Sequence, residues 1–383
     1  MAHSIIAPSS AGIWGPKEGC RGWPLMNQLF PDTEDSVESA EGTASHGVGE
    51  SLIGFGARGL TPKAEEYVGG QAANGVVIDQ DMYDGALVYA NDVRSVMCSA
   101  AVFTPAIEQT VCASRIHDEA WGTPDCWLYD EKNRTLYLWD YKYGHLLVEA
   151  FENWQLLVYL CAILEHLDID GLEDQYVRVE FRIVQPRAFH PKGQVRSWSF
   201  MACDARAYFN QLQASALESL SPGAETRSGA HCRNCNARHG CEAALTAGMG
   251  LYEVAAKPVP MNLDALALGV QQNIVTRAIK QLEYLKTGYD AEIEARVRRG
   301  EGVPYWRTEQ GVGRETWSRP SEEVIRMGQM FGQDLRQKNP VTPKQAVSLG
   351  IDAAVIKGYS HKPQTGVKIV PDNGNHAKEV FSK

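Results

Sequence analysis

The sequence has no apolar run long enough to cross a lipid bilayer. Its longest run, LLVYLCAIL from Leu156 to Leu164, has nine residues, about half of the roughly 20 that a transmembrane helix needs. The first residues also lack the basic stretch and apolar core of a secretory signal. With 44% hydrophobic and 9% aromatic residues, we expect a folded cytoplasmic protein without a membrane partner.

The chain also lacks the positive charge with which a protein coats nucleic acid, because its formal net charge is −10. The distribution is uneven. Residues 296–383 contain 15 lysines and arginines against 9 acids, a net of +6, which leaves −16 for residues 1–295. This asymmetry favours phosphate contacts by the C-terminal part and cation binding by the acidic part. Two solvated surfaces of opposite charge are the simpler interpretation of the same numbers.

Nine cysteines without an export signal favour free thiols or metal ligands over disulfides, because the cytosol keeps thiols reduced. Three of them form the C-x2-C-x5-C pattern of CRNCNARHGC, at Cys232, Cys235 and Cys241. Three thiolates fill only part of the coordination of a tetrahedral ion or an iron-sulfur cluster, so a fourth ligand is required. For zinc, His231 or His239 could supply it.

Hydrophobic periodicity predicts an α/β fold. Helical spacing predicts helices over 78–97, 148–167 and 205–220, and β patterns are found in IEQTVCA, YVRVEFRIV and VRSWSFMA. The order from Ile107 is then strand, hairpin, helix, strand, strand, helix, which is typical of a mixed central β-sheet flanked by helices. We expect a first domain over 1–245, a long helical segment over 246–300 and a small basic module over 301–383.

A hairpin in GTPDCWLYDEKNRTLYLWDYKYG brings two carboxylates together. If its turn is centred between Lys132 and Asn133, Asp125 lies opposite Asp140. Like charges directly opposite each other destabilise a sheet, and a divalent cation between them would compensate.

The alternation of side chains along the second strand places Lys142 on the same face as Asp140. Lys142 would then be close enough to orient or deprotonate a water on the cation. This combination indicates a phosphodiester hydrolase, whereas the plainer interpretation is a solvated hairpin end with an Asp-Lys pair. The opposite face would carry Tyr137, Trp139 and Tyr141.

Four short motifs resemble those of PD-(D/E)XK nucleases, in particular the RecB-type exonuclease branch. GTPD, ending at Asp125, and DYKYG, starting at Asp140, resemble the second and third motifs. EGTASH, ending at His46, resembles the first, and QLLVY matches the Q-x-x-x-Y of that branch. Gln155 and Tyr159 are four residues apart and therefore share one helix face.

The resemblance implies a restriction-endonuclease-like core and a role for each matched residue. It implies that Lys142 positions the attacking water and that Gln155 and Tyr159 contact the DNA backbone. It also implies a Mg²⁺ or Mn²⁺ site. Its ligands would be His46, Asp125, Asp140 and the backbone carbonyl of Tyr141.

The resemblance extends to the cysteines. In AddB-like and CRISPR-associated exonucleases of this branch, one cysteine precedes the nuclease motifs and three follow them. Cys20, Cys232, Cys235 and Cys241 have the same order. This implies a [4Fe-4S] cluster that ties the N-terminal residues to the end of the nuclease domain, with Zn²⁺ as the alternative.

Most of the chain also resembles an uncharacterised family common in bacteriophages and prophages, through segments such as RIVQPR, WSRPSEEV and KPQTGVKIVPD. Together the resemblances imply a metal-dependent DNA exonuclease of phage recombination, replication or end processing. It would act in the bacterial host cytoplasm, with a phage recombinase or single-strand-binding protein as a possible partner. The alternatives are an endonuclease, a non-catalytic DNA-binding or recombination-accessory protein on the same fold, and a zinc-stapled scaffold.

Overall fold

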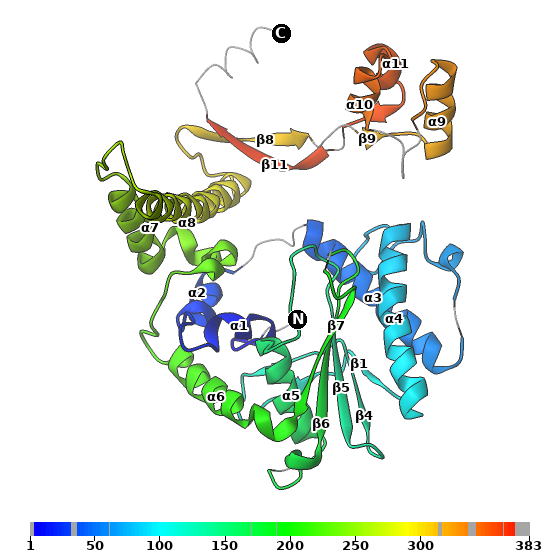
Figure 1. Ribbon diagram of the computed structural model, residues 1–383, viewed down its shortest axis with the longest axis vertical. Helices are drawn as coiled ribbons and strands as arrows, with labels where there is room; N and C mark the ends of the chain where they lie inside the picture. Colours follow the sequence, from blue (N-terminus) through cyan, green and yellow to red (C-terminus); the bar gives the residue numbers. More distant parts are fainter. Residues whose placement is uncertain are drawn as a thin grey trace. The chain divides into compact units, whose positions relative to one another are not determined.

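The computed structural model divides the chain into two compact units, residues 1–285 and 286–383 (Figure 1). No helix among the described residues is both long and apolar enough to span a membrane. The predicted domains 1–245, 246–300 and 301–383 stay a prediction. The residues described are 4–31, 37–60, 62–169, 171–188, 190–312, 316–335, 342–362 and 364–371.

The first unit is built on a five-stranded sheet with the order β1-β4-β5-β6-β7. Only the β5–β6 pair is parallel, so the sheet is mixed as predicted. The hairpin register is also confirmed, because Cys126 pairs with Trp139 and Asp130 with Thr135. The strands are β1 (Ala106–Ile107), β4 (Cys126–Asp130), β5 (Thr135–Tyr141), β6 (Arg178–Val184) and β7 (Val195–Met201).

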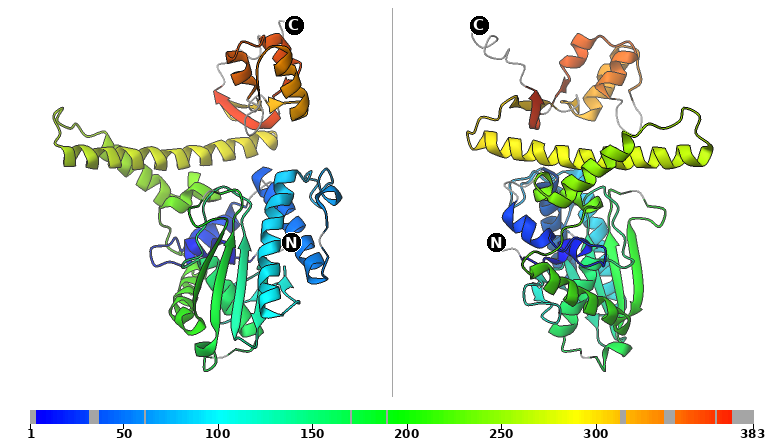
Figure 2. Two further views of the ribbon diagram at one scale, coloured as in Figure 1. Left: turned by 45° about the vertical axis from the view of Figure 1, so that its right-hand side comes forward. Right: turned by 90° about the vertical axis from the view of Figure 1, so that its left-hand side faces the viewer.

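Helices cover both faces of this sheet (Figures 1 and 2). On one face, Leu136 and Leu138 of β5 share a buried cluster with α5 (Trp154–His166) and α6 (Arg206–Leu220). On the other face, Trp139 and Tyr141 share a second cluster with α3 (Val37–Ala57) and α4 (Gln80–Ala100). The alternation predicted for this strand, and the α/β fold with a mixed sheet flanked by helices, are therefore confirmed.

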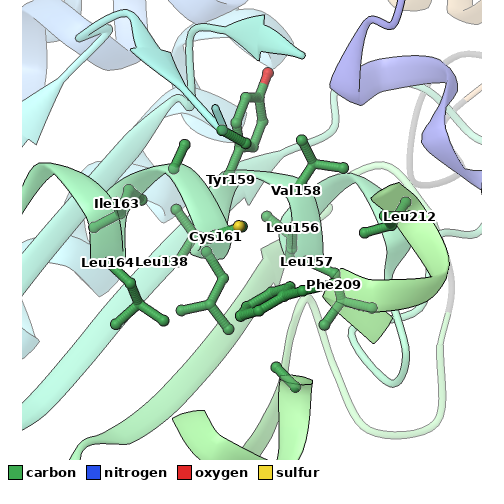
Figure 3. Close-up of a cluster of buried hydrophobic side chains, with 14 of the residues drawn as sticks. Leu138, Leu156, Leu157, Val158, Tyr159, Cys161, Ile163, Leu164, Phe209 and Leu212 are labelled. Carbon is green, nitrogen blue, oxygen red and sulfur yellow. The ribbon is translucent and has the colours of Figure 1, made fainter. Parts of the chain in front are cut away.

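The apolar run from Leu156 to Leu164 forms the middle of α5 and is buried along its whole length. Asn153 begins the helix, because its side-chain oxygen accepts from the backbone N–H of Leu156 at 3.1 Å. Figure 3 shows the run packed between the sheet and Phe209 and Leu212 of α6. A helix enclosed on all sides explains an apolar run without polar interruption.

Helix α3 was not predicted from the sequence. It contains five glycines among 21 residues, and glycine lowers helix propensity by roughly 1 kcal/mol per residue. Gly49 shows one use of them: a Cβ there would lie 2.9 Å from the ring of Tyr89 in α4. Glycine thus allows α3 and α4 to pack closely, and this packing stabilises a helix of low intrinsic propensity.

The single strand predicted in IEQTVCA is wrong. The segment forms two short strands, β1 and β2 (Val111–Cys112), which pair with β4 and with β3 (Trp121–Gly122) respectively. Glu108 separates them with a φ of +47°, a left-handed conformation that interrupts the extended backbone.

Further helices complete the first unit. Helix α8 (Ala265–Arg298) is one helix of 34 residues that runs from the first unit into the second, and Gly269 and Gly288 do not interrupt it. The other helices of unit 1 are α1 (Ala11–Trp14), α2 (Trp23–Leu29) and α7 (Glu242–Ala255). There are also short 3₁₀ helices at Pro8–Ser10, Ala64–Glu66, Asp174–Tyr176, Ala202–Ala205, Ala230–Asn234 and Asn236–His239.

The second unit has its own small core around Val324, Met327 and Leu335. In the described residues of this unit, two antiparallel pairs, β8 with β11 and β9 with β10, accompany three short helices. Their bounds are β8 (Trp306–Val312), β9 (Thr316–Trp317), α9 (Ser321–Met330), α10 (Pro343–Ser348), α11 (Ala353–Lys357), β10 (Ser360–His361) and β11 (Gln364–Pro371).

Candidate metal centre

Three potential metal ligands from distant segments meet at one edge of the sheet. His46 comes from α3, Glu108 follows β1, and Asp125 directly precedes β4. His46 Nδ1 lies 3.4 Å from Asp125 Oδ1 and 3.9 Å from Glu108 Oε1. One ligand atom of each residue lies within 4.8 Å of the other two. This spacing could hold a single cation.

Glu108 is the ligand candidate that the sequence did not reveal. Its backbone N–H donates to the carbonyl oxygen of Asp125 at 3.2 Å, which fixes it beside the second motif. The left-handed φ of Glu108 costs roughly 1–2 kcal/mol for a residue with a side chain. The only signal in the sequence was an acid within a short β pattern.

Asp125 is held by both of its oxygens. Its Oδ2 accepts from the backbone N–H of Tyr141 at 2.6 Å, and its Oδ1 faces His46. Burial raises the pKa of this carboxyl, but the charges and hydrogen bonds of His46, Lys142 and the Tyr141 amide outweigh burial and lower the pKa. Asp125 therefore stays ionised as a ligand must.

Asp140 lies opposite Asp125 at the end of β5 and is 2% exposed. Its Oδ1 accepts from Lys142 Nζ at 2.9 Å and from Gln155 Nε2 at 3.1 Å. Its Oδ2 is buried without a hydrogen-bond partner in the part of the chain that the structure describes. Burial and the nearby Asp125 raise the pKa of Asp140 against the opposing effect of Lys142. A buried carboxylate oxygen without a partner is costly unless a cation binds it.

His46 is partly accessible, with 30% of its side chain exposed. Burial favours the neutral imidazole, but Asp125 and Glu108 outweigh it and raise the pKa of His46 to about 10. Without a metal ion, a proton on His46 thus balances the two carboxylates. A cation entering here would replace that proton, since a ligating imidazole must be neutral.

Lys142 is held between Asp140 and Gln155, with its Nζ 3.3 Å from Gln155 Oε1. Burial lowers the pKa of Lys142, whereas Asp140 and Asp125 raise it, and the net shift is upward. A lysine that keeps its proton can orient a nucleophile and balance negative charge. Of the two roles considered for Lys142, this favours orienting a water over deprotonating it.

Gln155 and Tyr159, the two residues of the Q-x-x-x-Y motif, contact the site itself. Gln155 joins Asp140 and Lys142 through its amide. The Tyr159 hydroxyl donates to the carbonyl oxygen of Thr123 at 3.1 Å and points away from the apolar cluster (Figure 3). The same helix face therefore supports the second and third motifs; the role in DNA contact stays a prediction.

The side chain of Tyr141 fixes α3 relative to the sheet. Its hydroxyl lies 2.8 Å from Ser45 Oγ in a buried hydrogen bond, and its ring stacks on Tyr89 with centroids 5.0 Å apart. The His46 ring lies 5.2 Å from the Tyr141 ring. A Cβ on Gly85 would come within 3.0 Å of the Tyr141 hydroxyl. This packing holds His46 over the carboxylates.

The four selected cysteines gather in a second region of unit 1. Cys20 is buried in a small cluster with Cys235, and Cys232 in another with Cys241. Backbone N–H groups of Arg227 and Gly229 donate to the sulfurs of Cys20 and Cys232, both at 3.4 Å. None of the nine cysteines, all of which lie in described segments, forms a disulfide.

His231 connects the two small cysteine clusters. Hydrogen bonds to the thiols of Cys20 and Cys232 raise the pKa of His231 to about 10. Burial raises the pKa values of these two thiols, but the bond and charge of His231 outweigh burial and lower both. Burial chiefly raises the pKa of Cys235 to about 11, and the charges of Cys232, Cys20 and Cys241 add to the rise. The structure thus places Cys20 beside Cys235 and, through His231, near Cys232, whereas a cluster held by all four cysteines stays a prediction.

The sulfurs are less tightly grouped than the ligands of the first site. Among the described residues, only His46, Glu108 and Asp125 form a set of three with ligand atoms all within 4.8 Å of one another. No three of the cysteine sulfurs meet this spacing.

Comparison with known families assigns the chain. A family model described as "Protein of unknown function (DUF2800)" matches residues 3–372. The chain belongs to the DUF2800 family. No curated protein and no solved structure matches it. For this member of DUF2800, arguments about function therefore depend on the two sites described above.

Proposed function

We propose that this DUF2800 protein is a metal-dependent deoxyribonuclease of the PD-(D/E)XK type, acting as an exonuclease on DNA ends. The observation that carries the proposal is the buried, unpartnered Oδ2 of Asp140 beside Asp125, His46 and Lys142. These residues come from three separate segments. Packing alone does not require them to meet, and two opposed carboxylates disfavour the hairpin that holds them.

The residues fit a hard divalent cation. Three carboxylates, one imidazole and the backbone carbonyl of Tyr141 would supply oxygen and nitrogen ligands, which suit Mg²⁺ or Mn²⁺. Bound there, the cation would stabilise negative charge on the scissile phosphate and lower the pKa of a water. The ligand set proposed for it is His46, Glu108, Asp125, Asp140 and the Tyr141 carbonyl.

The remaining chemistry belongs to the side chains. Lys142, which keeps its proton, would orient the attacking water and neutralise charge at the phosphate. Gln155 would keep Lys142 and Asp140 in this arrangement through its two amide contacts. Tyr159 would hold the Thr123 backbone and thereby the position of Asp125. Gln155 and Tyr159 would also meet the DNA backbone near the site.

The cysteine region fits a [4Fe-4S] cluster held by Cys20, Cys232, Cys235 and Cys241. A zinc ion with bonds of about 2.3 Å would draw four sulfurs to about 3.8 Å from one another. No three of the described cysteine sulfurs lie within 4.8 Å of one another, so the thiols are not in the spacing of a zinc site. The backbone N–H groups that point at two of the sulfurs also stabilise thiolates. Zinc remains the alternative, and visible absorption distinguishes the two.

The proposed setting is DNA recombination, replication or end processing in a phage, where the basic second unit would contact DNA or a recombinase or single-strand-binding partner. The second candidate is a DNA-binding accessory protein without turnover. The complete set of ligands beside a charged lysine favours the nuclease, because mere DNA binding has no use for two opposed buried carboxylates.

The test is degradation of end-labelled linear DNA and closed circular DNA, single- and double-stranded, with Mg²⁺ or Mn²⁺. We expect the wild-type chain to degrade linear DNA, and Lys142→Ala to lose at least about a hundredfold in rate. Lys132→Ala, in the exposed hairpin turn, is the matched control and should retain activity.

Loss of circles would indicate an endonuclease. A wild-type protein that binds DNA and has intact visible absorption but cuts nothing would exclude the nuclease and support the accessory role.

A further inference from the structure

Strand β7 forms one edge of the central sheet. It is the last strand in the order β1-β4-β5-β6-β7, and all seven of its residues pair with β6 without a bulge. No other described segment pairs with it. Its sequence, VRSWSFM, contains no proline, glycine, lysine or acid, the residues with which proteins usually protect a long edge. A further strand can therefore add to β7.

The hydrogen bonds at the two ends of β7 show which of its backbone groups face outward. At one end the Gln185 N–H donates to the Gln194 carbonyl oxygen at 2.8 Å, and at the other the Ala202 N–H donates to the Val177 carbonyl oxygen at 2.9 Å. In an antiparallel ladder every second residue bonds to the same neighbour. The even-numbered residues of β7 thus bond to β6. The groups that face the open edge belong to Val195, Ser197, Ser199 and Met201.

The side chains of β7 place hydroxyls on one face of the edge and aromatic rings on the other. Ser197 and Ser199 are both exposed. Trp198 and Phe200 are half-buried and stack with their ring centroids 4.2 Å apart. Both rings pack on the buried Phe181, at 5.8 and 5.1 Å. The aromatic patch therefore reaches the open edge with a firm support behind it.

A second copy of β7, antiparallel and with Trp198 on a two-fold axis, fits this edge in register. Ser197 of each copy then lies opposite Ser199 of the partner subunit, and these residues form a hydrogen-bonded pair through their outward backbone groups. The two Trp198 rings form a non-hydrogen-bonded pair, in which side chains come closest. Cross-strand aromatic pairs and hydroxyl pairs both stabilise a sheet.

The charges at the two ends of β7 complement each other in the same register. Lys192 lies three residues before Val195, and Asp204 lies three residues after Met201. Both are exposed, and neither forms an ion pair with a described residue. Asp204 Oδ2 accepts from the Met201 N–H at 3.2 Å, and this N–H faces the open edge. The two-fold arrangement brings Lys192 of each copy to Asp204 of the partner subunit.

We propose that β7 pairs with β7 of a second copy of this chain and joins their two five-stranded sheets into one. Such an interface is isologous, because each chain contributes the same surface, and its main-chain bonds form by β-augmentation. Asp140 lies two strands away, on β5, so each chain keeps its own metal centre. The proposal goes beyond the proposed nuclease function and does not depend on it.

Two other occupants fit this edge less well. An extended peptide from another protein could use the outward backbone groups, but nothing would match it to the charges at both ends of the strand. A DNA strand could stack a base on the exposed Phe151, which contacts Trp198. The loop that carries Phe151 also carries Glu149 and Glu152, however, and carboxylates repel backbone phosphates. The charges therefore favour a second copy.

The first test is sedimentation velocity of the whole chain over a range of concentrations, without DNA. We expect a monomer–dimer equilibrium. Its dissociation constant should rise at least about tenfold in Ser197→Lys/Ser199→Lys, because like charges then oppose each other at two positions. Ser95→Lys/Ser99→Lys, at two exposed serines of α4, is the matched control and should dimerise like the wild type. A wild type that is monomeric at every concentration, or a dimer that the strand variant does not weaken, would overturn the proposal.

The second test shows whether the partner is another copy in this register. Lys192→Glu and Asp204→Lys should each weaken the dimer, because each places like charges together at both ends of the interface. An equal mixture of the two variants should dimerise again, since the introduced glutamate then meets the introduced lysine and the other end keeps the native pair. A mixture that stays monomeric would contradict the two-fold register.

These measurements are independent of DNA cleavage. A chain that dimerises through β7 but cuts no DNA would contradict the nuclease alone, and a chain that cuts DNA as a monomer at every concentration would contradict the dimer alone.

Discussion

The two candidate metal-binding regions of the first unit are built on different supports. The carboxylates of the metal centre flank paired strands, and α3 is fixed over them through Tyr141. The cysteine region instead uses two 3₁₀ helices, Ala230–Asn234 and Asn236–His239, and two small apolar clusters. The metal centre thus keeps its shape through the core, whereas the cysteine region has little core of its own.

Because of this difference, we expect ligand substitutions in the two regions to have different effects, on function in the metal centre and on stability in the cysteine region. A centre carried by the sheet should lose function but not fold when a ligand is changed. A centre carried by short turns should lose stability, because ion or cluster binding there contributes to folding free energy. The predictions below run from the largest expected effect to the smallest.

We expect Asp125→Asn to abolish DNA cleavage, with a loss of at least about a thousandfold, because the amide binds a cation poorly. Its oxygen can still accept from the Tyr141 N–H, so the midpoint of thermal unfolding should change little. Rates on labelled DNA and a thermal melt on the same preparation measure the two effects. A large drop in the midpoint would show that this centre, too, depends on its ligands for folding.

Cys232→Ser should lower the free energy of unfolding by about 3 kcal/mol or more and remove visible absorption, since a cluster ligand is lost. Denaturant unfolding of protein purified without oxygen gives the first value and its spectrum the second. Cys98→Ser, at an exposed thiol in α4, is the control. If Cys232→Ser and Cys98→Ser had equal free energies of unfolding, the cysteine region would not depend on its ligands for stability, and it would not differ from the metal centre in this respect.

Tyr141→Phe should cost about 1 kcal/mol of stability, because it leaves the buried Ser45 hydroxyl without its partner. It should also weaken Mn²⁺ binding several-fold, since α3 then holds His46 less firmly. Calorimetric titration with Mn²⁺ measures this effect. Tyr129→Phe, at the other end of the hairpin, should leave the Mn²⁺ affinity unchanged. A similar loss of Mn²⁺ affinity in Tyr129→Phe would show that the hydrogen bond between Tyr141 and Ser45 does not position His46.

The smallest effect concerns the hairpin turn. Asp130 accepts from the backbone and side chain of Asn133 at 3.1 and 2.7 Å, and the Asn133 side chain chiefly lowers the pKa of Asp130. A lowered pKa stabilises the fold above the ordinary carboxyl pKa, and this stability is lost as pH falls through the folded value.

Asp130→Asn should therefore cost less than about 1 kcal/mol at pH 7 and almost nothing near pH 3. Urea unfolding at both values measures it. An equal loss of unfolding free energy at pH 7 and near pH 3 would show that the effect comes from the geometry of the turn and not from the charge of Asp130.

The strength of each sequence pattern determined which parts of the fold could be predicted. The hairpin register followed from alternation around a polar turn, and it correctly placed Asp125 opposite Asp140. Helix α3, which carries His46, could not be predicted because its five glycines lower the helix propensity of the segment.

Glu108 could not be predicted as a ligand for another reason. It is itself a left-handed residue between two short strands, and hydrophobic periodicity does not indicate such a residue. The approach of Cys20 to the other cysteines was expected from a family resemblance alone, because local patterns carry no information across such a separation.

That separation gives the two regions different places in the order of synthesis. Cys20 leaves the ribosome more than 200 residues before Cys232, whereas the residues proposed for the metal centre are complete once Tyr159 has emerged. Domains tend to fold from the N-terminus as they are made. The cysteine region can close only after β7 and α6 exist, so its closure marks the point at which the five-stranded sheet and the helices that cover it have been translated.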